Sequence, residues 1–208
     1  MSPGRGGVDE DKRATLRRFA ALGGASPLVG LASASERDSG SDSDVPDAIA
    51  GYVGATPGAH FSKLRDDLQL GTGETQHHLR TLERAGTVES RKDGDYRRYF
   101  IAGRFTEYEQ VALGYLRRDT PRGMVIALLE DPDQSASDLA GRLDVSRPTV
   151  SKYAAQLEDA ALLSRADGYE IERPETLLVL IVSHADSFGP DAAALAADAA
   201  DLVAYDPE

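Results

Sequence analysis

Apolar residues recur three or four positions apart between residues 60 and 86, on either side of a glycine-containing turn. This spacing is typical of two short amphipathic helices that each bury one face, and the turn between them makes the pair a helix-turn-helix. The second helix is expected over about residues 72–85. The apolar positions are Leu64, Leu68, Leu70, Leu79, Leu82 and Ala85.

After Gly86 the pattern changes to that of short strands. Residues 87–90 and 96–101 are expected to be strands, and the Asp93-Gly94 pair between them suits a tight hairpin turn. Two helices followed by a β-hairpin predict a winged helix.

A second copy of the pattern follows 75 residues later. The register holds without a gap from Phe61 and Ala136 to Val88 and Leu163. The turn residues Asp93 and Gly94 correspond to Asp167 and Gly168 once one residue is dropped. A duplicated helix-turn-helix and wing predicts a mainly α fold with small β-hairpin wings (α+β), built from two tandem modules and C-terminal helices.

The segments GETQHHLRTLERAGTV and VSRPTVSKYAAQLEDAALL resemble the recognition helices of archaeal tandem winged helix-turn-helix transcriptional regulators of the ArsR/MarR-like superfamily. The resemblance covers roughly residues 46–204 and implies a sequence-specific DNA-binding transcriptional regulator. The second wing, ADGYE, is shorter and nearly uncharged, and Gly71 stands where the second copy has the helix cap Ser146. The first module is therefore expected to make the main DNA contact.

The expected organisation has four parts. They are a disordered or signal-like leader with an acidic linker over 1–45, module 1 over 46–104, a connector helix with module 2 over 105–173, and C-terminal helices over 174–208. The connector is expected to break at Pro121.

The helix over about 72–85 is the expected reading helix. Burial of Thr75, His78, Leu79 and Leu82 would turn the polar residues of its N-terminal half outward, and this half enters the major groove in such motifs. The alternative is an ordinary solvated helix face. The outward residues are Thr72, Gly73, Gln76, His77 and Arg80.

The first wing concentrates positive charge. Arg91, Lys92, Arg97 and Arg98 lie in one hairpin, which suits contact with phosphates or the minor groove. Tyr96, Tyr99 and Phe100 are expected to anchor its strands in the core. In module 2 the outward candidates are Arg147, Ser151, Lys152 and Gln156.

The net charge of −12 argues against nucleic-acid binding, but the distribution of the charge along the chain does not. Residues 46–104 carry nine basic and eight acidic side chains, whereas residues 105–208 carry eight and twenty. The acidic, lysine-poor composition resembles that of proteins from extreme halophiles, and an acidic mesophilic protein is the alternative.

Other chemistry has little support in the sequence. Cysteine is absent, the four histidines lack metal-ligand spacing, and no nucleophile elbow, phosphate loop or kinase signature occurs. We therefore expect no enzyme activity, cofactor or metal, and no small-molecule ligand is evident.

The segment 12–34 has two interpretations. Arg17 and Arg18 precede a weakly apolar run and Ala32-Ser33-Ala34, which resembles a twin-arginine export signal or membrane tether. Phe19 directly after the arginines and the acidic residues upstream depart from that pattern, and the run is short for a membrane span. A disordered leader on a cytoplasmic protein is the favoured interpretation.

The C-terminal helices are expected to carry an interface. The run TLLVLIVSHA after Pro174 is apolar nearly all round, so it packs between modules or against a second subunit. A homodimer would match a palindromic site in double-stranded DNA, and packing within one chain is the alternative. The rival function is a winged-helix protein-interaction or dimerisation module without DNA binding.

Overall fold

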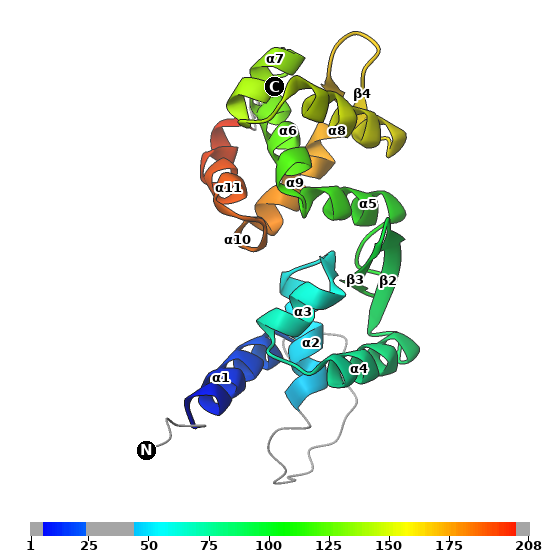
Figure 1. The fold of residues 1–208 in the computed structure, drawn as a ribbon, viewed down its shortest axis with the longest axis vertical. Coiled ribbons are helices and arrows are strands. Elements are labelled where there is room, and N and C mark those ends of the chain that lie inside the picture. Colours follow the sequence, from blue (N-terminus) through cyan, green and yellow to red (C-terminus); the bar gives the residue numbers. More distant parts are fainter. Residues whose placement is uncertain (1–5, 24–43, 203–208) are drawn as a thin grey trace, which may run out of the picture. The chain divides into compact units, whose positions relative to one another are not determined.

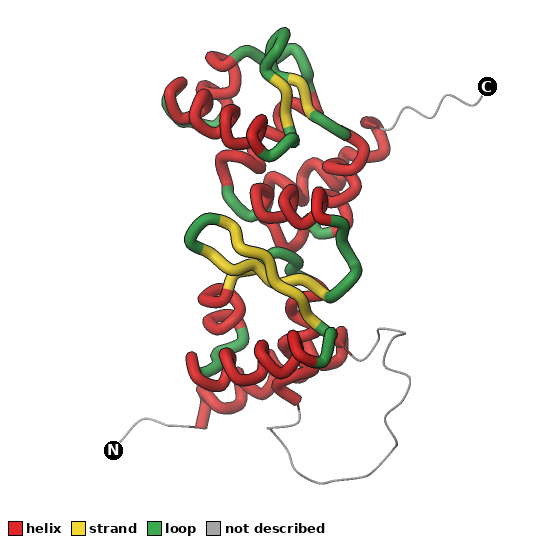
Figure 2. The backbone as a smooth tube through the Cα atoms, turned by 90° about the vertical axis from the view of Figure 1, so that its right-hand side faces the viewer, coloured by secondary structure: helices red, strands yellow, loops and turns green. Residues whose placement is uncertain are grey.

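The computed structural model describes residues 6–23 and 44–202. The chain divides into two compact units, Met1–Phe105 and Thr106–Glu208, one residue beyond the expected module boundary. Figure 1 traces the elements of both units in sequence order. Helices dominate each unit, and the strands form short hairpins, the longer of them in the first unit (Figure 2).

The first unit contains the predicted helix-turn-helix. Its helices are α1 (Gly6–Gly23), α2 (Asp44–Ala55), α3 (Phe61–Asp67) and α4 (Thr72–Arg84). α3 starts after His60, whose Nδ1 accepts the Lys63 backbone N–H at 3.3 Å. Gln69 adopts a φ of 53°, so the chain turns sharply between α3 and α4.

A three-stranded antiparallel sheet forms the wing of this unit. Its strands are β1 (Ala59–His60), β2 (Val88–Asp93) and β3 (Tyr96–Ile101), in the order β1-β3-β2. Asp93 pairs with Tyr96 across the predicted Asp-Gly turn, where Gly94 has a φ of 59°. The strand β1 is absent from the sequence prediction, because two residues are too few to show a period.

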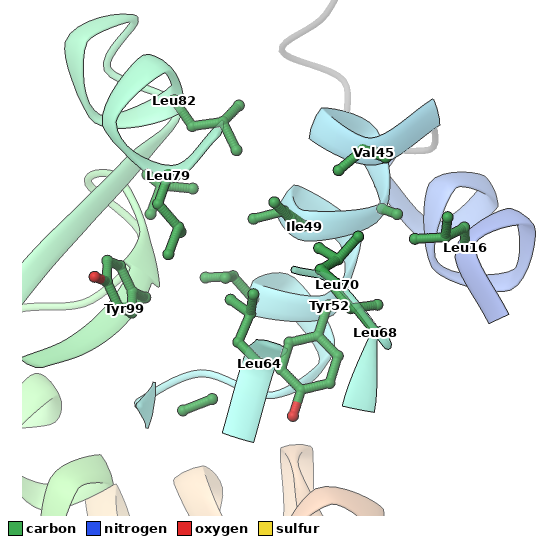
Figure 3. Packing of buried hydrophobic residues seen from close by; sticks show 14 residues of the cluster. Leu16, Val45, Ile49, Tyr52, Leu64, Leu68, Leu70, Leu79, Leu82 and Tyr99 are labelled. Atoms are coloured by element: carbon green, nitrogen blue, oxygen red, sulfur yellow. The ribbon is translucent and has the colours of Figure 1, made fainter. Parts of the chain in front are cut away.

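The core of the first unit lies between α2, α3, α4 and the sheet. Figure 3 shows Leu64 and Leu79 directed toward Ile49 of α2, with Tyr99 of β3 at the edge of the cluster. These leucines and Ile49 are at most 2 % exposed, and a fully buried side chain of this size contributes about 1.5–3 kcal/mol. The predicted apolar positions therefore form the interior that holds α4 in place.

The helix α1 differs from the expected disordered or signal-like leader. Leu16 is 4 % exposed within the core cluster, and the Phe19 ring meets Tyr52 of α2 edge-on at 5.1 Å between centroids. Periodic apolar residues at 16, 19 and 20 cover α2, which explains why this stretch is helical. Residues 24–43, which include most of the linker and Ala32-Ser33-Ala34, lie outside the described residues.

The second unit repeats the arrangement and adds helices. Its elements are α5 (Glu107–Leu116), α6 (Asp119–Glu130), α7 (Ala136–Arg142), α8 (Arg147–Asp159), β4 (Leu163–Ser164), β5 (Glu170–Ile171), α9 (Pro174–Ser183), α10 (Ala185–Phe188) and α11 (Pro190–Leu202). α6, α7 and α8 begin and end 75 residues after α2, α3 and α4. The left-handed positions Gln69 and Asp144, with φ of 53° and 51°, obey the same offset. The duplication therefore extends to the turn geometry.

The expected break at Pro121 is displaced. α5 ends at Leu116 and α6 begins at Asp119, so the proline lies in the first turn of α6 instead of between the helices. A proline is tolerated there because the first N–H groups of a helix have no partner within it.

The C-terminal helices pack within the second unit. Leu177 and Ile181 of α9 are fully buried there, while Val179 is 62 % exposed. Arg122 of α6 is 5 % exposed and donates to Asp191 of α11 at 2.8 Å, which ties α11 to the unit. None of the described helices is long and apolar enough to cross a membrane.

Candidate nucleic-acid interface

A short network of local hydrogen bonds caps the start of the reading helix α4. The Gly71 N–H donates to Glu74 Oε2 at 3.1 Å, and the Thr75 hydroxyl donates to the Gly71 carbonyl at 2.9 Å. Thr75 and Leu79 are buried, which turns the opposite face of the helix to solvent. The exposed residues of that face include Thr72, Gly73, Gln76, His77 and Arg80, the set expected from the sequence.

Two cations of the wing lie on the side that faces α4. Ser90 of β2 donates to Glu83 of α4, and strand alternation places Lys92 on the same face as Ser90. Lys92 pairs in register with Arg97, whose side chain is 63 % exposed and lies 3.8 Å from Glu83. The exposed Lys92 and Arg97 therefore flank the reading helix.

Arg98 is a correction to the expected interface. It is 3 % exposed, forms an ion pair with Asp93, and donates through Nη1 to the Gly58 carbonyl at 2.9 Å. Alternation along β3 places it on the face away from α4, opposite Arg97. A side chain held in this way stabilises the wing and is removed from the candidate contacts.

Arg91 shares that inner face. It pairs in register with Arg98 and is partly buried, so it is less accessible to a duplex than Lys92 beside it. The expected cluster of four wing cations is therefore divided between the two faces of the hairpin.

Tyr96 is a second correction within the wing. Tyr99 and Phe100 are buried as expected, but Tyr96 is 52 % exposed and lies 5.0 Å from the His60 ring between centroids. Burial, followed by the charges of Arg98 and Lys63, lowers the pKa of His60 below its usual value. The inner face of the wing thus holds a histidine whose neutral form is favoured, next to a buried cation.

The corresponding helix of the second unit, α8, exposes a smaller polar set. Ser146 caps it, with its hydroxyl accepting the Thr149 N–H at 3.3 Å. Arg147, Ser151 and Lys152 are exposed as expected, whereas Gln156 is partly buried. This face could meet a duplex, although with fewer reading residues than α4.

The wing of the second unit offers no open cation among its described residues 163–171. Its cation, Arg165, forms an ion pair with Glu158 of α8, and hydrogen bonding to Arg165 lowers the pKa of the Glu158 carboxyl. Arg165 and Glu158 occupy the positions of Ser90 and Glu83 in the first unit, 75 residues on. The same glutamate position contacts both wings, pairing with Arg165 in the second unit and lying 3.8 Å from the more exposed Arg97 in the first.

The sequence interpretation missed two contributors to this region. Glu83 joins the wing to α4, and its repeat at Glu158 was a signal that could have indicated an anchoring role. Lys12 of α1 lies 3.7 Å from Glu74 in the first turn of α4, and the assignment of residues 1–45 to a leader concealed it.

Two helix-turn-helix units that each end in a β-hairpin define a tandem winged helix-turn-helix protein. A family described as an N-terminal HTH domain matches residues 43–113, and one described as winged helix-turn-helix DNA-binding matches residues 117–160. These matches confirm the predicted fold class of two tandem modules.

The chain is similar to an uncharacterized HTH-type transcriptional regulator of Methanocaldococcus jannaschii, with 27 % identity over 124 residues. The match covers 59 % of this chain and 31 % of that relative, so the chain spans about a third of the relative's length. No solved structure matches the chain significantly. The similarity agrees with the archaeal regulators that the two recognition-helix segments resemble.

Proposed function

We propose that this protein is a sequence-specific DNA-binding transcriptional regulator and that its first unit makes the main contact. The observation that carries the proposal is the common side of α4 and the wing, where an exposed polar helix face is flanked by Lys92 and Arg97. Base edges and phosphates are the two kinds of group that such a surface meets in a duplex.

The N-terminal half of α4 would enter the major groove. Gln76 suits a bidentate contact with adenine, while Arg80 and His77 can reach guanine acceptors or phosphate oxygens. Lys92 and Arg97 would neutralise phosphates beside the groove, which supports affinity without reading sequence. Arg98, on the opposite face of the hairpin, stabilises the wing through its contacts with Asp93 and the Gly58 carbonyl.

The acidic charge of the chain does not oppose this assignment. Twenty acidic residues fall in 105–208, outside the main contact proposed for the first unit. Within this acidic region, the exposed residues Arg147, Ser151 and Lys152 of α8 would make a weaker second contact. A DNA-binding regulator must have access to the chromosome, and we therefore propose that the protein is cytoplasmic. We also propose that it has no enzyme activity.

We further propose a homodimer formed through the C-terminal helices. Val179 leaves an apolar side chain exposed on α9, and paired copies would present two α4 helices to a palindromic site. Light scattering of the full chain and of Val179→Asp tests this, because a dimer built on α9 would dissociate in the variant.

The rival is a protein-interaction module of winged-helix fold. The neutralised wing of the second unit favours it for that unit, because Arg165 is already paired with Glu158. In the first unit Arg97 also lies within ion-pair distance of Glu83, at 3.8 Å, but its side chain is 63 % exposed and Lys92 beside it is exposed as well, which favours DNA contact there.

A binding selection from genomic fragments, followed by titration of the enriched duplex at stated salt concentrations, tests the proposal. The Lys92→Ala/Arg97→Ala variant should weaken binding to all sequences, while Arg142→Ala/Arg165→Ala, which removes the same charge from the second unit, should change it little. Equal affinities of the wild-type chain and the wing variant would overturn the proposed interface.

A further inference from the structure

The helix α1 carries a second group of cations, and one of them, Lys12, lies beside the reading helix. Its last twelve residues, 12–23, contain Lys12, Arg13, Arg17 and Arg18 and no acidic residue. Lys12 Nζ lies 3.7 Å from Glu74 Oε2, so this basic segment starts next to the first turn of α4. That turn belongs to the half of α4 that would enter the groove.

The apolar side of α1 is already occupied. Leu16 is buried against α2, and Phe19 contacts the Tyr52 ring at 5.1 Å, so the helix is fixed to the unit that carries the reading helix. Arg13 and Arg17 are exposed and stand four residues apart, which places them on one side of the helix. They form a short cationic row on a helix packed against α2, after the acidic residues Asp9, Glu10 and Asp11 of its first half.

We propose that Arg13 and Arg17 bind phosphates of the DNA backbone next to the groove that α4 occupies. The inference rests on the proposed function and extends it, because it makes α1 a third contact element beside the reading helix and the wing. Lys12 serves as a positioning residue, since it holds the start of the basic segment against Glu74. Phosphate contacts of this kind add affinity for every sequence and fix the orientation of the protein on the duplex.

An anionic membrane surface is the other polyanion that a basic helix can meet. An interfacial helix binds through a free apolar face, and Leu16 and Phe19 of α1 are used against α2. Leu22, at 52 % exposure near the end of α1, is a single apolar side chain and no substitute for such a face. The structure therefore favours duplex DNA.

The test uses the full chain and the duplex enriched in the genomic selection. Arg13→Ala/Arg17→Ala is compared with the wild-type chain and with Arg142→Ala/Arg165→Ala, which has the same net charge. The α1 variant should bind roughly tenfold more weakly to both the enriched and a scrambled duplex. The slope of log K against log salt concentration should fall by about 1 for each phosphate that the variant no longer neutralises. Because both arginines are exposed, its thermal midpoint should match that of the wild-type chain.

Three outcomes overturn the inference. One is an unchanged affinity and salt slope in the α1 variant while Lys92→Ala/Arg97→Ala still weakens binding, which would leave the proposed function standing. Another is an equal decrease in the charge-matched control, which would assign the effect to net charge. The third is weaker binding to vesicles of phosphatidylserine and phosphatidylcholine with DNA affinity unchanged, which would make α1 a lipid-binding element. A wild-type chain that binds no duplex would refute the proposed function itself.

Discussion

Arg97 and Arg98 are neighbours in β3, yet their side chains lie on opposite faces of the wing. The Arg97 side chain is 63 % exposed beside α4, whereas that of Arg98 is 4 % exposed and paired with Asp93. Two consecutive arginines thus have different tasks, one available to a partner and the other holding the hairpin against Gly58. The pair allows DNA binding and stability to be separated experimentally.

Arg98→Ala should lower the free energy of unfolding of the first unit. Removing one member of a buried ion pair leaves the other charge uncompensated, which costs about 3–5 kcal/mol for a fully buried pair and less here, because Asp93 is 22 % exposed. Urea denaturation measures the decrease in stability. Arg97→Ala is the matched control, and it should change the unfolding midpoint little while weakening DNA binding.

Substitution of the reading helix should change which sequence is preferred. Gln76→Ala or Arg80→Ala would each remove a base contact worth about 1–3 kcal/mol of discrimination. Repeating the binding selection with each variant measures the change. A variant that loses affinity equally for all duplexes, with its preference intact, would assign that residue to phosphate contact instead.

Ala161→Gly should stabilise the second unit. Ala161 has a φ of 55° in the turn after α8, where the first unit has Gly86 with a φ of 70°. A residue with a Cβ is strained in this left-handed region, so glycine should raise the free energy of unfolding by up to about 1 kcal/mol. Thermal denaturation checks the sign, and Gly86→Ala should show the opposite effect in the first unit.

The stability of the first unit should fall as the pH drops below about 6.5, the usual pKa of an unfolded histidine. The pKa of His60 is lowered in the folded chain by burial and by Arg98 and Lys63, so protonation favours the unfolded state. The stabilisation is complete above that pH and is lost as the pH falls toward the folded value. Its Nδ1 must also be unprotonated to accept the Lys63 N–H.

His60→Asn keeps an acceptor for that N–H but does not titrate, and it should lose less stability between pH 7.5 and 5.5. Urea midpoints of both proteins at the two pH values provide the comparison. If the two chains lose stability in parallel, His60 does not cause the acid sensitivity.

The sequence predicts the helix-turn-helix units well because their burial is periodic. Leu64, Leu79 and Leu82 mark the inner faces of α3 and α4, and the offset of 75 residues carries over to α7 and α8 without adjustment. The strand β1 could not be found in this way, because it is two residues long. The helix α1 has periodic apolar residues at 16, 19 and 20, but its basic residues gave it the composition of a leader.

The site is predicted less completely than the fold. Exposure of Gln76 and Arg80 follows from helical periodicity, but a hairpin of alternating residues does not show which of its faces is covered. That choice depends on contacts from other parts of the chain, such as the Gly58 carbonyl, 40 residues away, which accepts from Arg98 on this face. The burial of Arg98 is therefore a tertiary effect without a local signature.

The pairing of β1 with β3 has a mechanical consequence. His60 both ends β1 and caps α3, so a pull on the tip of the first hairpin would be transmitted to the start of α3 instead of merely bending the hairpin. Within the described residues of the second unit, β4 and β5 form a sheet of two strands with no third one. In this described part, the second wing therefore has no β-strand that links its hairpin to the start of α7, and a pull on its tip would not reach that helix by the route present in the first unit.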